Sequence, residues 1–296
     1  MRLRGEIHMI ELDHKIIGIK NNKKILFFYF QNSQMNVFKR YLYTGNWIDL
    51  EYDDTKEVRR GPYLAYIISH VNRLEALGLY DHIIYYDKAD ITNSLYKFLN
   101  SFENIMFLDL EMTMPSYKFK GKGFKTEVIQ AGLVIFDKAG EEILRYNNYI
   151  EPVITKSLTK RAEDFLGISE EEFKEKCIPY LQFYNDFKEI LLKYDPAIVV
   201  YGRNDMLVLN DSYNIHEVES LKDLTRYVNL CQLIKTHYEL KNDPGLFRLY
   251  QTYYDTEDIQ VHDAIDDSLV TAKVFEAFKE DIIYKTKTKD IQDTFD

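Results

Sequence analysis

The chain has 296 residues, long enough for two domains with a sizeable core. Its 46% hydrophobic and 29% charged residues are typical of a globular protein, and no apolar run approaches the ~18 residues of a membrane span, so we expect no membrane partner. The charge of −10 is uneven: residues 1–104 carry 14 Lys and Arg against 13 Asp and Glu, whereas residues 105–296 carry 24 against 35. This balance argues against bulk binding of duplex nucleic acid, but it suits acids that hold metal ions beside a less acidic segment.

The start of the chain and its cysteines predict a cytoplasmic protein. The first residues, M-R-L-R-G-E-I-H, lack the apolar segment of a signal peptide. Cys177 and Cys231 form neither a disulfide framework nor a metal-binding spacing, and reduced cysteines are typical of the cytosol.

Residues 1–80 show the pattern of a small antiparallel barrel. Short apolar or alternating segments, separated by turn residues, predict strands at 7–12, 15–20, 23–30, 35–43, 47–52 and 63–71. The pattern resembles a cold-shock or other OB-type domain. In that resemblance, residues 23–30 match one nucleic-acid-binding strand, and Val37-Phe38-Lys39-Arg40 lies where the second would be.

The resemblance implies that the barrel grips single-stranded nucleic acid, because such domains stack bases on aromatic rings inside a basic rim. The stacking rings would be Phe28, Phe30 and Phe38. The basic residues beside them would be Lys23, Lys24, Lys39 and Arg40. The alternative is that the rings fill the barrel core, since alternation along a strand turns half of them inward.

Residues 81–104 predict a helical connector. Asp90 is a favourable N-cap for a helix over residues 91–102, whose apolar side chains recur on one face. We assign no chemistry to this segment.

The next stretch, I-M-F-L-D-L-E-M-T at 105–113, predicts a buried strand interrupted by Asp109 and Glu111. Residues at i and i+2 of a strand point to the same face, and two buried carboxylates that close repel each other. A divalent cation with oxygen ligands would resolve that conflict. The alternative is a strand end at which both acids reach solvent.

Residues 105–280 predict an α/β domain with a mixed sheet flanked by helices, because strands come first and then alternate with helices. After a polar loop, strands are expected at 127–136, 142–150 and 197–201, and helices at 158–165, 170–176, 179–194, 245–253 and from His262 to about 280. Residues 281–296 are expected to form a solvated, charged tail.

Two further acidic sites accompany Asp109 and Glu111. One is Asp205, which follows a buried strand in Y-G-R-N-D-M, and the other is H-D-A-I-D-D at 262–267. In this order and spacing the motifs resemble the DEDDh family of 3′–5′ exonucleases, in the ribonuclease H-like superfamily. The matching residues are Asp109, Glu111 and Thr113 of D-x-E-x-T, Asp205 of the second motif, and His262, Ala264 and Asp267 of H-x-A-x-x-D.

The resemblance implies a site that holds two Mg²⁺ or Mn²⁺ ions and hydrolyses a phosphodiester. Asp109 would bridge both ions, Glu111 and Asp267 would complete the site of the ion that activates water, and Asp205 would support the other ion. His262 would be the general base, because an imidazole can accept a proton at neutral pH. Thr113 and the backbone near Met112 would contact the terminal nucleotide.

The third motif contains neighbouring acids that need separate interpretations. Asp263 is a natural helix N-cap, and Asp266 follows three residues later, as in a capping box. Asp266 is also four residues after His262, so helix periodicity alone favours it over Asp267. The family pattern places His262 before the regular helix, and for that reason we assign the ligand role to Asp267.

We therefore predict a metal-dependent 3′–5′ exonuclease that shortens single-stranded ends, RNA in preference to DNA, and releases nucleoside 5′-monophosphates. The RNA preference rests on the barrel and on the Met-Pro pair after the first motif, which resembles RNA-trimming members of the family. The alternatives are a DNA proofreading or repair exonuclease, and a nucleic-acid-binding adaptor without activity. Members of the family often dimerise, so a homodimer stays open.

Overall fold

The computed structural model describes residues 1–21, 24–78, 82–121, 123–258 and 262–295. The chain forms two compact units, Met1–Lys97 (unit 1) and Phe98–Asp296 (unit 2). Residues 82–87, which were expected in the connector, form a strand of unit 1 because they pair with the strand before them. Among the described residues, no helix is both long and apolar enough to cross a membrane.

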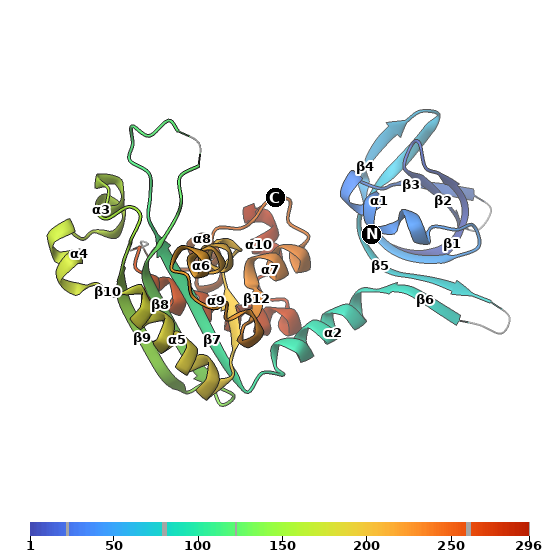
Figure 1. Ribbon diagram of the computed structural model, residues 1–296. Helices are drawn as coiled ribbons and strands as arrows, with labels where there is room; N and C mark the ends of the chain where they lie inside the picture. Colours follow the sequence, from blue (N-terminus) through green and yellow to red (C-terminus); the bar gives the residue numbers. More distant parts are fainter. Residues whose placement is uncertain (22–23, 79–81, 122, 259–261, 296) are drawn as a thin grey trace. The chain divides into compact units, whose positions relative to one another are not determined.

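Unit 1 is a closed barrel, as predicted (blue to cyan in Figure 1). Its strands are β1 (Arg2–Glu11), β2 (Ile16–Asn21), β3 (Lys24–Tyr29), β4 (Trp47–Arg60), β5 (Tyr63–Leu77) and β6 (His82–Asp87). They follow the order β3-β2-β1-β4-β5-β6 with antiparallel pairing. The barrel closes because β3 also pairs with β5 in parallel, where Phe28 lies opposite Tyr66.

One predicted strand of the barrel, residues 35–43, is wrong. The structure has helix α1 (Asn32–Phe38) followed by a single 3₁₀ turn, Lys39–Tyr41. The helix begins where the Gln34 side chain accepts a hydrogen bond from the backbone N–H of Gln31 at 3.1 Å. Met35 and Phe38, three residues apart, are buried while Val37 is exposed, which is the spacing of a helix face rather than of a strand.

The three rings that were expected to stack on bases fill the core of the barrel instead. Phe28 and Phe30 are fully buried and Phe38 is 7% exposed, so the structure contradicts a stacking role for them. The cause is strand alternation, since Phe27 and Tyr29 point outward from the same strand. Lys39 and Arg40 are exposed on the 3₁₀ turn, whereas Lys23 lies outside the described residues.

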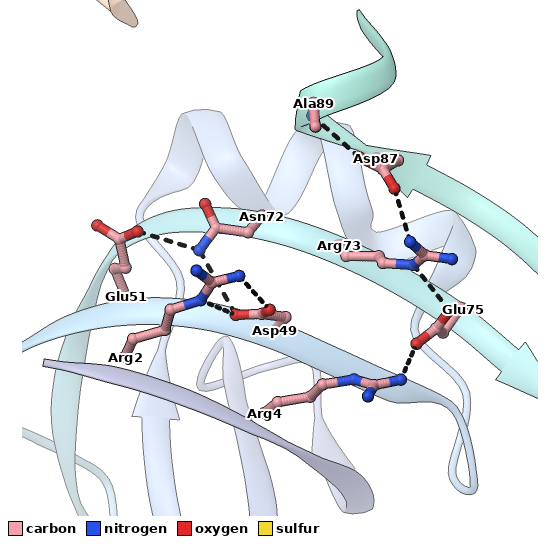
Figure 2. A network of polar contacts seen from close by, with 9 residues as sticks. All are labelled: Arg2, Arg4, Asp49, Glu51, Asn72, Arg73, Glu75, Asp87 and Ala89. Carbon is pink, nitrogen blue, oxygen red and sulfur yellow. Dashed lines mark hydrogen bonds and ion pairs between the residues drawn. The ribbon is translucent and has the colours of Figure 1, made fainter. Parts of the chain in front are cut away.

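Helix α2 (Lys88–Leu99) follows β6 and starts three residues earlier than expected. Asp87, not Asp90, satisfies its first N–H groups: the Asp87 carboxylate accepts hydrogen bonds from the backbone of Ala89 at 2.9 Å and of Asp90 at 3.3 Å. The same aspartate accepts a hydrogen bond from Arg73, which ties the start of the helix to the barrel (Figure 2).

Unit 2 is built on a six-stranded mixed sheet in the order β10-β9-β8-β7-β11-β12. The strands are β7 (Asn104–Met112), β8 (Val128–Asp137), β9 (Glu142–Glu151), β10 (Ile178–Pro179), β11 (Ala197–Val200) and β12 (Arg226–Asn229). The helices are α3 (Lys160–Leu166), α4 (Glu170–Lys176), α5 (Tyr180–Tyr194), α6 (Asn204–Ile215), α7 (Leu230–Tyr238), α8 (Leu246–Tyr254), α9 (Ala264–Tyr284) and α10 (Thr288–Phe295). Antiparallel β7, β8 and β9 form a meander, and β11 joins β7 in parallel (Figure 1). This is the predicted α/β architecture.

Central strand β7 presents different residues to its two faces. Met106, Leu108 and Leu110 belong to the core cluster that also contains residues of α5 and α6. The residues between them face α9, where the ring of Phe107 packs edge-on against Phe275 at 5.4 Å between centroids. Asp109 and Glu111 share the face of Phe107, so the hydrophobic pattern of the strand turns both acids toward α9.

The C-terminal segment is not a solvated tail as expected. Helix α9 continues to Tyr284 and α10 packs against α7 and α8, with Ile291 buried. Asp281 holds this turn together, because its buried carboxylate accepts hydrogen bonds from the Tyr238 hydroxyl and from the backbone N–H of Lys287.

Candidate active site

Asp109 and Glu111 lie near the end of β7, directly opposite two residues of β8. Asp109 pairs with Gly132, and Glu111 pairs with Gln130. Glu111 is 9% exposed, so its carboxylate is largely removed from water. Glu111 is therefore buried and Asp109 is half-buried, so neither acid lies at a solvent-exposed strand end.

Asp205 reaches the same place from the other side of β7. Strand β11 pairs with β7 only as far as Phe107, which leaves the next N–H groups of β7 without a strand partner on that side. The Asp205 carboxylate, in the first turn of α6, accepts a hydrogen bond from the backbone N–H of Leu110 at 3.1 Å. The shortness of β11 thus positions the acid of the second motif beside Asp109.

Helix α9 brings the third motif onto the sheet at Gly132. A Cβ at this position would overlap the backbone of Ala264 and Ile265, so only glycine allows the helix to approach this closely. The hydroxyl of Ser268 donates a hydrogen bond to the carbonyl of Gly132 at 2.7 Å. Because Gly132 lies opposite Asp109, this contact sets the start of α9 directly against the first acid.

The structure brings His262 and Asp267, but not Asp266, into the cluster. Asp267 is 7% exposed, whereas Asp266 is exposed to solvent. One ligand atom each from Glu111, His262 and Asp267 lies within 4.8 Å of the other two. The His262 ring also stacks on Phe165 of α3 at 4.0 Å between centroids.

Gln130 was missed by sequence reasoning, although it orients the third motif. Its buried side chain donates hydrogen bonds to Asp263 at 2.9 Å and to Asn147 at 3.0 Å. Asp263 in turn caps α9 by accepting a hydrogen bond from the backbone N–H of Ile265, as expected. The residue belongs to E-V-I-Q-A-G-L-V, but nothing in that segment signals a contact more than 130 positions away.

Burial and mutual repulsion dominate the electrostatics of the cluster. Burial, followed by the carboxylates of Asp205 and Glu111, raises the pKa of Asp109 well above its usual range. Burial and the neighbouring Asp267 raise the pKa of Glu111 to about 7. Burial raises the pKa of Asp205 to about 6, although the hydrogen bond from Leu110 opposes the change. Carboxylates gathered in this way favour a cation among them.

Thr113 and Met112 follow the acids at the end of β7. Thr113 is buried and exchanges two hydrogen bonds with Glu127, both at 2.9 Å: its backbone N–H donates to the Glu127 carbonyl, and its hydroxyl accepts from the Glu127 N–H. Met112 is partly exposed beside this pair. The threonine thus closes the loop between β7 and β8 next to the acids.

Comparison with known proteins places this cluster inside a recognised domain. The family model described as an exonuclease (RNase T) matches residues 106–275, more than half of the chain, and it includes all five clustered motif residues. The probable 3′–5′ exonuclease KapD of Bacillus subtilis (strain 168) is 27% identical over 188 residues, which span 63% of this chain and 89% of that protein.

A second relative and a solved structure extend the comparison. The 3′–5′ exonuclease crn-4 of Caenorhabditis elegans is 24% identical over 191 residues, which span 59% of this chain and 62% of that protein. The crystal structure of the nuclease domain of 3′hExo, a DEDDh family member bound to rAMP, has a TM-score of 0.52 and 18% identity, and the match covers 60% of this chain and 93% of that domain. At 18% sequence identity, this comparison shows that the two proteins share a fold.

Proposed function

The chain belongs to the exonuclease family and is a 3′–5′ exonuclease of the DEDDh type, and from this premise we propose that it removes nucleotides from single-stranded ends with the help of divalent cations. The observation that carries the proposal is the convergence of three sequence-distant segments on one buried cluster, whose carboxylates raise one another's pKa. Such a cluster is costly to a fold unless a ligand compensates the charge.

The residues present fit Mg²⁺ or Mn²⁺. Asp109, Glu111, Asp205 and Asp267 offer hard oxygen ligands, and repulsion between buried carboxylates is relieved when a cation binds. Two such ions, when bound, neutralise the phosphate, activate water and stabilise the leaving 3′ oxygen.

The side chains of the chain itself have separate tasks in this proposal. The carboxylates of Asp205 and Glu111 are the charges that act most strongly on Asp109, so Asp109 would hold cations together with both of these neighbours. Stacking against Phe165 restricts the His262 ring, which accepts the proton of the attacking water as general base. Thr113 and the backbone at Met112 hold the terminal nucleotide, and hydrolysis releases it as a nucleoside 5′-monophosphate.

We favour RNA over DNA as the substrate. The barrel of unit 1 and the Met-Pro pair at 114–115 support this preference. Because Phe28, Phe30 and Phe38 are buried, they do not contact the substrate. The proposed contacts of the substrate in unit 1 are therefore Lys39 and Arg40, which are exposed. A cytoplasmic location and a homodimer remain predictions.

An assay with 5′-labelled single-stranded RNA and DNA of matched sequence tests the proposal. We expect stepwise shortening from the 3′ end that requires Mg²⁺ or Mn²⁺, is faster on RNA, and is absent in Asp109→Ala. Faster cleavage of DNA would favour the proofreading or repair alternative. Binding without any shortening in excess Mn²⁺ would instead identify a nucleic-acid-binding adaptor.

A further inference from the structure

A basic, aromatic arm joins β7 to β8 immediately after the acids of the first motif. The arm comprises the described residues 113–121 and 123–127, and the sequence from 114 to 126 contains no acid. Lys118, Lys120 and Lys125 are exposed. By contrast, residues 98–296 as a whole carry 24 Lys and Arg against 36 Asp and Glu. The arm is therefore a local cationic surface on an acidic unit.

Two aromatic side chains of the arm are exposed to solvent beside these lysines. Tyr117 is 71% exposed and Phe119 is 45% exposed. Large rings held in water lose the free energy that burial would provide, so an exposed pair among lysines suggests a ligand surface. Bases of single-stranded nucleic acid provide flat apolar faces for such rings, and their phosphates attract the lysines.

Hydrogen bonds fix the base of the arm, and a contact between two aromatic rings joins its two sides further out. At the base, Thr113 and Glu127 form their two hydrogen bonds, and the hydroxyl of Thr159 donates to the carbonyl of Met114 at 3.0 Å. Further out, the rings of Phe119 and Phe124 meet edge-on at 5.8 Å between centroids. The hydrogen bonds thus fix the base of the arm, and the ring of Phe124 restrains that of Phe119.

Two side chains of helix α3 contact the arm and the third motif, respectively. The Arg161 guanidinium lies over the ring of Tyr117, 5.9 Å from its centroid, and Phe165 of the same helix stacks on His262. Residues four apart lie on one helix face, with their Cβ atoms about 5–6 Å apart. Tyr117, Arg161, Phe165 and His262 therefore form a continuous path from the arm to the acids.

We propose that the arm and α3 form a track for single-stranded nucleic acid, on which Tyr117 and Phe119 stack bases while the three lysines and Arg161 contact phosphates. The substrate rests on the proposed function: when the 3′-terminal nucleotide lies at the cluster, the rest of the strand extends on its 5′ side. The track holds these upstream nucleotides without reading their sequence, since every base offers a stacking face.

Binding measurements on full-length Asp109→Asn protein test the track without requiring cleavage. Fluorescence anisotropy would compare 5′-labelled 20-mers and 3-mers of uridylate and thymidylate. We expect Lys118→Ala/Lys120→Ala/Lys125→Ala to bind the 20-mers at least about tenfold more weakly. Its plot of log affinity against log salt should be shallower by about 2, since each phosphate contact on a single strand contributes about 0.7.

Separate aromatic variants distinguish stacking from charge. Tyr117→Ala and Phe119→Ala should each weaken 20-mer binding about fivefold or more with no change in salt slope, because neither removes a charge. The matched control is Tyr284→Ala/Lys289→Ala. Tyr284 is 70% exposed, Lys289 is also exposed, and Tyr284 lies about 26 Å from Asp267 along α9. This control should bind like the parent.

The inference is overturned if the lysine variant binds 20-mers normally, or if it loses the same affinity for 3-mers, which would indicate a disturbed cluster rather than a track. Thermal unfolding shows whether each variant is folded. If Asp109→Asn binds through the arm while the wild-type protein cleaves no end, the track stands and the proposed function fails. If the wild-type protein cleaves and the arm variants bind 20-mers normally, the proposed function stands and the track fails.

Discussion

Buried carboxylates occur in both units, but their neighbours are positively charged in unit 1 and negatively charged in unit 2. In unit 1, Glu75 accepts hydrogen bonds from Arg4 at 2.5 Å and from Arg73 at 2.8 Å, and Asp49 accepts two from Arg2 (Figure 2). In unit 2, the strongest influences on Asp109 and Glu111 are burial and other carboxylates. The first arrangement is complete within the fold, whereas the proposed function assigns a divalent cation to the second.

The pKa values express the same difference. Burial alone would raise the pKa of Glu75, but hydrogen bonds from His82, Arg4 and Arg73 lower it to about 2. Burial and Asp267 raise that of Glu111 to about 7. A buried acid with paired donors therefore stabilises the barrel, while the clustered acids of unit 2 hold repulsion that ion binding can relieve.

The largest effect is expected from Asp109→Asn, which removes one charge from the centre of the cluster. We expect turnover on labelled single strands to fall by at least about a thousandfold, because charge stabilisation at the reacting phosphate is lost. In EDTA, however, the melting temperature of unit 2 should rise by about 2–4 °C as repulsion is relieved. Far-UV circular dichroism reports this transition, since most helices belong to unit 2.

Asp266→Asn is the matched control for this variant. Asp266 lies beside Asp267 on α9 but is exposed to solvent, so its replacement should leave turnover within about twofold of wild type. Near-normal cleavage by Asp109→Asn, or loss of cleavage in Asp266→Asn, would contradict the assignment of the acids.

Gly132→Ala is expected to have the next largest effect. Its methyl group would overlap the backbone of Ala264 and Ile265, which cannot move aside as a flexible side chain could. We expect unit 2 to lose about 3 kcal/mol of stability and turnover to fall about a hundredfold, because a displaced α9 would move Asp267, and the His262 that precedes the helix, away from Asp109. Denaturant unfolding and the cleavage assay measure the two changes.

Gly140→Ala provides the comparison, since nothing lies within 4 Å of a Cβ there and the residue is in the turn before β9. Its positive φ of 84° should cost about 1 kcal/mol without any change in turnover. Equal loss of activity in both variants would show that the approach of α9 to Gly132 has no special role.

The acids of unit 2 could be predicted from sequence because each carries a strong local signal. Two charges interrupt an apolar strand at 105–113, and the spacing of the other motifs matches a known pattern. The contacts that assemble them could not be predicted. Gln130 and Gly132 sit in an ordinary apolar strand, and their importance arises from packing against residues more than 130 positions away.

The barrel shows a different limit of sequence analysis. Its strands were visible, but a shift of one residue decides whether Phe28 or Phe27 faces the core, and turn chemistry alone did not settle the register. The segment at 35–43 has apolar residues at spacings compatible with either helix or strand. Only packing of Met35 and Phe38 into the barrel core selects the helix.

Acidification of the metal-free protein should stabilise unit 2 between about pH 7 and 4.5, and destabilise unit 1 only below about pH 4.5. The folded-state pKa of Glu111 is about 7, above its ordinary 4.5, so unit 2 should gain on the order of 2 kcal/mol as the pH falls from about 7 to 4.5. The pKa of Glu75 is about 2, below its ordinary 4.5, so its contribution to unit 1 should be present above pH 4.5 and lost as the pH falls toward 2.

Separate probes distinguish the two responses. Trp47 of β4 is the single tryptophan of the chain, so its fluorescence follows unfolding of unit 1, while circular dichroism follows the helices of unit 2. Saturating Mn²⁺ should abolish the gain in unit 2, because the bound cation keeps the carboxylates charged. Parallel responses of both probes between pH 7 and 4.5 would contradict the contrast between the units.

The smallest effect is expected in unit 1 from Arg73→Met. Arg73 joins Glu75 and Asp87, but Glu75 keeps its hydrogen bonds with Arg4 and His82. Glu75 then loses one of its three donors but keeps the other two. We therefore expect unfolding followed by Trp47 fluorescence to show that unit 1 is less stable by about 1 kcal/mol at neutral pH. The sign is opposite to that of Asp109→Asn in EDTA, although each variant removes one charge.

Lys56→Met is the control for this comparison, since Lys56 pairs with Asp53 at 3.3 Å on an exposed part of the barrel. Solvent screens such a pair, so its loss should change stability by less than about 0.5 kcal/mol. If Arg73→Met were equally mild, the paired acids of unit 1 would contribute no more than surface charges. Their lowered pKa values would then not distinguish a structural carboxylate from one that awaits a cation.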